Sequence, residues 1–219
     1  MLISKDLAYL LGVIYGDGHI KNGTKSKTDL STDYKIGIEI TDIKYLQNTI
    51  LPLFKIFTNT EAKISIRKRK NRKKTGILEV RNKQFFLRLT EKIKTHKGPK
   101  TKNLKIPSSI KNLPLEIKNE FIAGYFDTDG GFRGKTLGIT TNSKYIQNFF
   151  CTSLDLNNIL YYRDSWINQK YNETYYGVHI KKDNIDIFLK TFKLRNPEKL
   201  ASIKARFSCT GAGVVKRAG

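Results

Sequence analysis

Hydrophobic residues recur along the chain with two periods, one typical of helices and one typical of strands. In the first stretch, four large aliphatic residues occur at the spacing of a helix: Leu7, Leu10, Leu11 and Ile14. We expect Asp6 to cap this helix and Gly18 to end it in a left-handed conformation. Because the stretch is apolar on nearly every side, the predicted helix must be buried.

Strand spacing follows at residues 34–41, where Ile36, Ile38 and Ile40 alternate with polar residues. Pattern and turn residues then predict a helix over 43–57 with a kink or boundary at Pro52, a hairpin of strands 62–69 and 77–81, and a helix over 85–93. The order returns in the second half, with an apolar helix ending at Asp129 and later elements at 136–141 (strand), 144–156 (helix), 159–167 and 174–181 (strands), 184–192 and 197–207 (helices).

One apolar block occurs twice. Residues 9–18 read YLLGVIYGDG and residues 121–130 read FIAGYFDTDG, so Asp17 and Asp129 hold equivalent positions. The long period suits two pseudo-symmetric halves better than a solenoid. If the two buried helices pack together, Gly12 and Gly124 allow their backbones to approach closely. The two aspartates would then meet at one end of the pair.

These patterns predict an α+β fold of two pseudo-symmetric αββαββα halves, with paired central helices and antiparallel sheets that form a saddle. We expect a first half over residues 1–95, a linker over 96–114 that is rich in Lys, Pro and Ser, a second half over 115–207 and a loose tail over 208–219.

Charge indicates the partner. The chain of 219 residues has 41 Lys and Arg against 19 Asp and Glu, a net charge of +22, which favours a polyanion. Nucleic acid is preferred over a membrane surface because no strongly basic amphipathic helix is evident. A hydrophobic fraction of 39% excludes a disordered chain.

The remaining composition narrows the class of protein. Cys151 and Cys209 are far apart in the sequence, so neither a zinc site nor a disulfide framework is expected. The apolar segment over 7–16 is too short for a membrane span or a normal signal peptide. We therefore expect a protein of the prokaryotic cytosol or of an organellar matrix, neither secreted nor bound to a membrane.

Both blocks resemble the signature of the LAGLIDADG homing endonucleases, and their number and spacing are similar to the single-chain, two-motif members. The resemblance covers nearly the whole chain. It implies a monomeric, intron- or intein-encoded enzyme that uses Mg²⁺ to cut a long double-stranded DNA site and leaves short 3′ overhangs. The two copies differ, with Tyr15 against Asp127 and Gly16 against Thr128, which suggests unequal halves and an asymmetric target.

The resemblance also assigns site residues. The penultimate acid of each signature is the metal ligand, which carries over to Asp17 and Asp129, with Gly16 and Thr128 as backbone oxygen donors beside them. Mg²⁺ prefers oxygen ligands, and two close carboxylates repel each other unless a cation lies between them. Members of the family also place a basic group after the last helix of each half, for which the candidates are Lys102 or Lys105 and Lys193 or Arg195.

A basic β-ribbon fits the DNA major groove, so outward-facing strand residues are the candidates for contacts with DNA. In the first half they are Lys35, Glu39, Lys63, Ser65, Arg67, Arg69, Arg72, Glu79 and Arg81. In the second half they are Thr140, Asn142, Tyr161, Arg163, Ser165, Tyr175, His179 and Lys181. The run from Arg67 to Lys74 suits phosphates, which give affinity but little sequence information.

Two alternatives use the same scaffold without DNA cleavage, namely an intron-RNA maturase and a non-cutting DNA-binding protein. Retention of both acids argues against lost catalysis. A third possibility is the endonuclease part of an intein, although no initiating Cys or Ser and no terminal His-Asn is present, so self-splicing is not expected.

Overall fold

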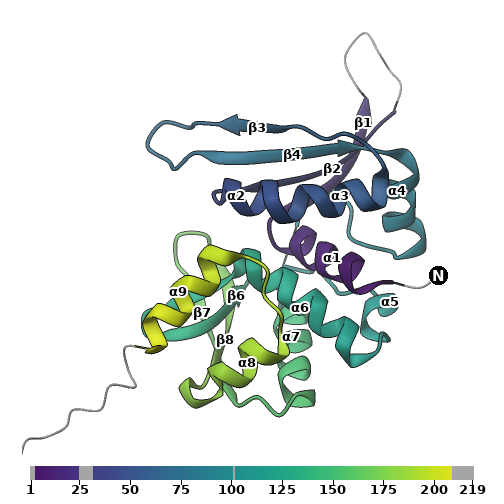
Figure 1. Ribbon diagram of the computed structural model, residues 1–219. Coiled ribbons are helices and arrows are strands. Elements are labelled where there is room, and N and C mark those ends of the chain that lie inside the picture. The colour runs from purple at the N-terminus through teal and green to yellow at the C-terminus, as the bar shows by residue number, and fades with distance from the viewer. Residues whose placement is uncertain (1–2, 25–31, 101, 209–219) are drawn as a thin grey trace, which may run out of the picture.

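Two helices, α1 (Lys5–Asp17) and α6 (Leu115–Asp129), lie side by side at the centre of the molecule (Figure 1). The computed structural model describes residues 3–24, 32–100 and 102–208. Ser4, rather than Asp6, caps α1, since its side chain accepts a hydrogen bond from the Leu7 amide. As the apolar pattern predicted, α1 is buried, and every residue from Leu7 to Gly16 is shielded from solvent.

The first half surrounds α1. Its strands are β1 (Gly18–Thr24), β2 (Thr32–Ile40), β3 (Ile64–Arg67) and β4 (Thr75–Arg81), which form an antiparallel sheet of order β1-β2-β4-β3. One continuous helix consists of α2 (Ile43–Tyr45), the π-helical turn η1 (Leu46–Ile50) and α3 (Leu51–Thr58). A second is α4 (Lys83–Leu87) followed by η2 (Arg88–Lys92).

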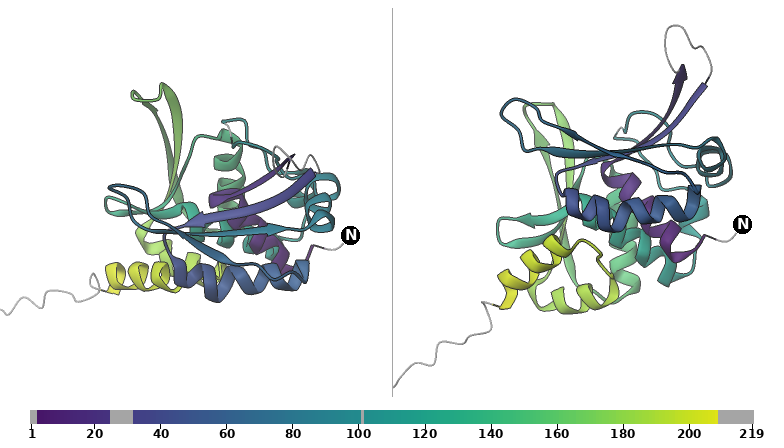
Figure 2. Two further views of the ribbon diagram at one scale, coloured as in Figure 1. Left: turned by 90° about the horizontal axis from the view of Figure 1, so that it is seen from above. Right: turned by 45° about the horizontal axis from the view of Figure 1, so that its top comes forward.

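The second half repeats this plan around α6. Strands β5 (Gly130–Arg133), β6 (Thr136–Thr141), β7 (Tyr161–Asn168) and β8 (Glu173–Ile180) form an antiparallel sheet of order β5-β6-β8-β7. The helices of this half are α7 (Lys144–Leu156), η3 (Lys182–Asn184), α8 (Ile185–Thr191) and α9 (Pro197–Ser208). Figure 2 shows the two four-stranded sheets with the helices gathered on one side of them.

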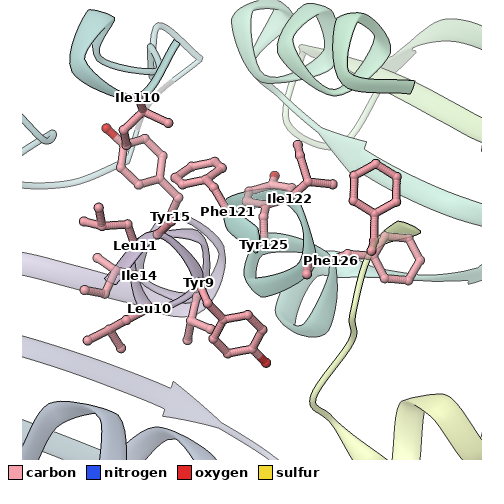
Figure 3. Close-up of a cluster of buried hydrophobic side chains, with 14 of the residues drawn as sticks. Tyr9, Leu10, Leu11, Ile14, Tyr15, Ile110, Phe121, Ile122, Tyr125 and Phe126 are labelled. Carbon is pink, nitrogen blue, oxygen red and sulfur yellow. The ribbon is translucent and has the colours of Figure 1, made fainter. Parts of the chain in front are cut away.

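The core runs through the helix pair into both halves. In Figure 3, Tyr15 of α1 meets Phe121 of α6, and the two rings are edge to face with centroids 5.3 Å apart. Leu10 and Ile14 point away from α6, whereas Phe126 points away from α1. Each central helix therefore fills the core of its own half as well as the interface.

The predicted α+β fold with two matched halves is confirmed, with several local differences. Gly18 is extended, with φ −90°, instead of left-handed. Its lack of a side chain is still required, because a Cβ there would lie 2.6 Å from Cα of Ile14. Strand β1 was missed, since the sequence after Asp17 is polar. Pro52 produces no break in the helix, because the π-helical turn η1 precedes it.

The segment predicted as a linker is packed. Helix α5 (Ser108–Lys111) lies within it, and Leu104, Ile106 and Ile110 are buried. The predicted last helix is present as α9, whereas the tail beyond Ser208 lies outside the described residues. Among the helices of the described ranges, none is long and apolar enough to span a membrane.

Candidate functional site

The two central helices pack backbone to backbone. A Cβ added to Gly12 would lie 2.7 Å from the Tyr125 amide nitrogen, and one added to Gly124 would lie 3.1 Å from the Val13 amide nitrogen. This contact aligns the helix ends, where a Cβ at Gly16 would lie only 3.5 Å from Cγ of Asp129. The repeated motifs therefore meet at their aspartates, as the sequence predicted.

The carboxylates of Asp17 and Asp129 are exposed on one side but crowded by protein on the others. Burial, followed by the charge of Asp129, raises the pKa of Asp17 to about 6, against the opposing effects of Lys100 and Lys199. Burial also raises the pKa of Asp129, although Lys100 and a hydrogen bond from Tyr125 act in the other direction. Two carboxylates at the C-terminal ends of helices form a strongly negative site.

Two lysines lie beside this pair. The ammonium of Lys100 donates to the Gly16 carbonyl oxygen at the end of α1. The ammonium of Lys199 donates to three carbonyl oxygens at the end of α6, at 2.7 Å to Phe126, 3.3 Å to Thr128 and 2.6 Å to Gly130. Burial lowers the pKa of Lys100 to about 8, although Asp129 and Asp17 raise it. Each half thus contributes one aspartate and one lysine.

The donor set fits a hard divalent cation. It consists of two carboxylates, and the nearby carbonyl oxygens of Gly16 and Thr128 already attract positive groups. Carboxylate and carbonyl oxygens are the ligands that Mg²⁺ prefers, and Mg²⁺ commonly keeps several waters. Over the described ranges, no group of three or more His, Cys, Asp or Glu gathers elsewhere to form a competing metal site.

The four basic residues predicted for the site have other neighbours. The Arg195 guanidinium pairs with Asp6 at 2.7 Å and with Glu120 at 2.8 Å, and so connects α1 to α6. Lys105 lies over the Tyr145 ring, 4.8 Å from its centroid. Lys102 lines a hollow of about 600 Å³ together with Asn142, and Lys193 is exposed. Within the described residues, Lys100 and Lys199 donate to the carbonyl oxygens at the helix ends that carry Asp17 and Asp129, and none of these four side chains takes part in those hydrogen bonds.

Sequence reasoning missed Lys100 and Lys199, although both lie within six residues of the candidates. Each follows a proline closely, in Pro99-Lys100 and in Pro197-Glu198-Lys199. This proximity to proline after the last helix of a half is a signal that could have identified them. Asp42, at the end of the second strand of the first half, caps α2, since its side chain accepts a hydrogen bond from the Tyr45 amide at 2.9 Å.

The strand residues that were predicted to contact DNA in the first half lie together on one face of the first sheet. Strand pairing places Lys35 opposite Arg81, Glu39 opposite Ile77 and Ile77 opposite Ser65, all on the face that points away from Ile36, Ile38 and Ile40. Carboxylates already hold several of its cations. Glu39 pairs with Arg67 at 2.9 Å and with Arg69 at 3.0 Å.

Further cations on this first-half face are also paired or solvated. Asp33 pairs with Arg81 at 3.0 Å, and Glu79 pairs with Lys35 at 3.3 Å. Lys63 and Arg72 are exposed residues of the loops that flank β3. The first half therefore presents a cationic surface whose arginines are oriented in advance by acids.

The second sheet differs from the prediction in register. Tyr161, Arg163 and Ser165 pair with Ile180, Val178 and Tyr176, so their side chains share the face of the core. The residues that share the outer face with Tyr175 and His179 are instead Tyr162, Asp164 and Trp166. Tyr162 pairs with His179 and Trp166 pairs with Tyr175, while Asp164 lies between them opposite Gly177. Placing Tyr161, Arg163 and Ser165 on that outer face was therefore wrong in geometry.

The outer face of the second sheet is largely aromatic. Tyr162 stacks on His179 with centroids 4.6 Å apart, and Trp166 stacks on Tyr175 at 6.1 Å. His179 Nε2 also lies 3.1 Å from an Asp164 carboxylate oxygen. Of the other predicted contacts, Thr140 lies on this face, Lys181 follows β8, and Asn142 lies in the turn between β6 and α7. The outer face of the first sheet is thus mainly charged, whereas the outer face of the second sheet is mainly aromatic.

Comparison with known proteins agrees with the two-half fold. The family model for the LAGLIDADG-like domain matches residues 116–193. A structure of mesophilic variants of the homing endonuclease I-DmoI is 20% identical, covers 92% of this chain and 98% of its own, and superposes with a TM-score of 0.69. I-DmoI in complex with DNA and Mn is 20% identical over 87% of this chain and 97% of its own, with a TM-score of 0.65.

A second homing endonuclease has the same fold. I-WcaI bound to its DNA recognition sequence is 19% identical, covers 94% of this chain and 88% of its own, and gives a TM-score of 0.60. Comparison with curated protein sequences finds no match. Residues 116–193 therefore form a LAGLIDADG-like domain, and the chain as a whole has the two-half fold of the LAGLIDADG homing endonucleases I-DmoI and I-WcaI.

Proposed function

We propose that this protein is a site-specific endonuclease that hydrolyses both strands of a long, asymmetric DNA target and leaves short 3′ overhangs. The observation that carries the proposal is the meeting of Asp17 and Asp129 at the ends of two packed helices, each followed directly by the first strand of a sheet. Because both halves belong to one chain, a monomer contains the complete site.

The chain's residues supply binding, orientation and charge. Asp17 and Asp129 would hold Mg²⁺ or another divalent cation, with help from the Gly16 and Thr128 carbonyl oxygens. Such a cation lowers the pKa of bound water and neutralises charge on the phosphate and on the leaving oxygen. Tyr125 orients Asp129 through its hydrogen bond. Lys100 and Lys199 add positive charge where the scissile phosphates would lie.

The two sheets would hold the DNA on either side of the metal centre. The first-half face carries paired arginines and lysines that can reach phosphates and guanine edges. The outer face of the second sheet offers Tyr162, Trp166 and Tyr175, which are suited to apolar contacts with bases. Unequal faces favour an asymmetric target over a palindrome.

Cleavage of the natural target tests the proposal. We take the chain to be encoded within an intron, so the substrate is a duplex that spans the joined exons flanking this intron, and the assay compares Mg²⁺ with a chelator. Asp17→Asn and Asp129→Asn should each reduce the single-turnover rate by about 100-fold or more, since even residues around a metal ligand contribute about 10–100-fold. Asp186→Asn removes an exposed acid of α8 and serves as the matched control.

Binding measured in parallel separates the alternatives. If wild type cuts and both variants bind the DNA without cutting it, the aspartates serve the chemistry. If both variants cut at the wild-type rate, the assigned centre is wrong. A non-cutting binding protein on this scaffold would give the same affinity in all forms and no strand breaks in any of them.

A further inference from the structure

The two central helices differ two residues before each aspartate, where α1 has Tyr15 and α6 has Asp127. Both side chains turn away from the carboxylate pair and contact the backbone that follows the last helix of their own half. Tyr15 meets His96, and Asp127 meets Arg195. Lys100 comes four residues after His96, and Lys199 comes four residues after Arg195. Equivalent positions therefore contact equivalent lysine-bearing segments.

Asp127 holds its segment tightly. The residue is 3% exposed, and its Oδ2 accepts hydrogen bonds from the amide nitrogens of Arg195 at 2.6 Å and Asn196 at 3.2 Å. Asn196 is itself buried, and its side chain accepts a hydrogen bond from the Lys199 amide at 3.0 Å. The carboxylate thus fixes the first turn of α9, from which the Lys199 side chain reaches the end of α6.

This contact crosses the interface between halves. The hydroxyl of Tyr9, on α1, donates to Asp127 Oδ2 at 2.5 Å and is 2.5 Å from the Tyr45 hydroxyl of α2. The Arg195 guanidinium also lies over the Tyr9 ring, 4.1 Å from its centroid. The segment that carries Lys199 therefore rests on groups from both halves.

Tyr15 holds the other segment more loosely. Its hydroxyl accepts from the His96 amide at 3.4 Å and donates to the Lys105 carbonyl oxygen at 3.3 Å. A cavity of about 10 Å³ remains between Tyr15, His19, His96 and Lys100, enough for about one water molecule. Within the described residues, Lys100 also makes one carbonyl contact where Lys199 makes three.

We propose that Asp127 and Tyr15 are positioning residues for Lys199 and Lys100, and that the Lys199 side is the more rigidly preorganised of the two. The proposal rests on the proposed endonuclease function for its catalytic consequence, but the positioning itself does not depend on that function. This role explains why the two signatures differ at this position. The Asp127 carboxylate accepts hydrogen bonds from three donors, whereas the Tyr15 hydroxyl accepts from one.

Amine labelling tests positioning without any need for DNA cleavage. The folded, full-length protein is pulsed with an amine-reactive ester, and modification of each lysine is measured by mass spectrometry. Asp127→Asn should increase Lys199 labelling several-fold and leave Lys100 unchanged, because a neutral amide oxygen is a weaker acceptor than a carboxylate oxygen for the three donors that converge on Oδ2. Asn196→Ala, which keeps Asp127 intact but removes the cap next to Lys199, should do the same. Unchanged Lys199 labelling in both variants overturns the proposal.

Strand-resolved cleavage tests the consequence. Single-turnover rates are measured for each strand of an oriented duplex, together with affinity for the DNA in Ca²⁺. Asp127→Asn should slow the reaction by about 10–100-fold, as loss of a supporting contact does at metal sites, with unchanged affinity. Lys199→Met should slow the same strand most. Tyr15→Phe removes two long, weak hydrogen bonds and should cost only about 3-fold, mainly on the strand that Lys100→Met slows.

A double variant decides between positioning and general damage to the fold. Asp127→Asn combined with Lys199→Met should be no slower than Lys199→Met alone, whereas Asp127→Asn combined with Lys100→Met should be additive. Additivity with Lys199→Met, or equal slowing of both strands, overturns the proposal. If wild type cuts no DNA, the proposed function fails, and the labelling result still decides whether the two residues position the lysines.

Discussion

The Thr128 side chain occupies the space that Gly16 leaves open at the end of the opposite helix. A Cβ at Gly16 would lie 2.8 Å from the Thr128 Cβ. The Thr128 hydroxyl is fixed by its hydrogen bond to the Tyr125 carbonyl oxygen at 2.9 Å. The two signatures are therefore unequal in a complementary way, with one small residue and one larger residue at matched positions.

This relationship predicts a compensating pair of substitutions. Gly16→Ala should lower the free energy of unfolding by about 1–3 kcal/mol, because the added methyl overpacks the interface. The same change should cost less in a Thr128→Gly background, where room is available. Urea unfolding of wild type, both single variants and the double variant gives the coupling energy. Equal costs of Gly16→Ala in both backgrounds would contradict this packing.

Alternation predicted the first sheet well because its two faces differ in polarity. Ile36, Ile38 and Ile40 face the core, and Lys35 and Glu39 face outward. Residues 161–166 of β7 give no such contrast, since Tyr161 and Tyr162, or Arg163 and Asp164, are polar or aromatic on both sides. The face of β7 depends on its pairing with β8, which a local pattern does not contain.

Within the site, a local sequence pattern predicted the aspartates but not the lysines. Asp17 and Asp129 could be predicted because the apolar helices that carry them repeat in sequence. Lys100 and Lys199 reach the site through irregular segments, whose paths depend on tertiary contacts of His96 and Arg195. No periodicity marks such residues.

Titration of Asp17 predicts how stability depends on pH. Its pKa is about 6 in the folded protein against an ordinary value of 3.8, so the folded state binds more protons between these values. The stability of the metal-free protein should therefore fall as pH rises from about 4 to about 6, because ionisation of this carboxyl disfavours the folded state. Asp17→Asn should flatten this dependence and raise Tm above pH 6.

Scanning calorimetry of both forms across this pH range, with and without Mg²⁺, provides the measurement. Added Mg²⁺ should raise Tm of wild type above pH 6, since it binds the ionised folded state, and should have less effect on Asp17→Asn. Identical pH slopes for wild type and variant would show that Asp17 does not titrate in this window.

Arg195 is expected to affect stability through both helices. Arg195→Met leaves Asp6 and the nearly buried Glu120 without their partner. Loss of one partner from a fully buried pair costs about 3–5 kcal/mol, so about 2 kcal/mol is expected for this partly exposed group. Arg195→Lys should recover only part of this, because it cannot bridge both acids with one planar fork. Urea unfolding that shows no loss for Arg195→Met would contradict the bridge.

The register of β7 gives a prediction about DNA binding. Arg67 and Arg163 are both exposed arginines on edge strands, but Arg67 lies on the outer face of the first sheet and Arg163 on the core-side face of the second. Arg67→Ala should weaken DNA binding and reduce the slope of log affinity against log salt by about 1, as expected for one lost phosphate contact. Arg163→Ala, the matched control, should leave the slope unchanged. Fluorescence anisotropy over a series of salt concentrations measures both. An equal loss of slope in the two variants would mean that DNA also contacts the core-side face of β7, and the sheet would not bind DNA through its outer face alone.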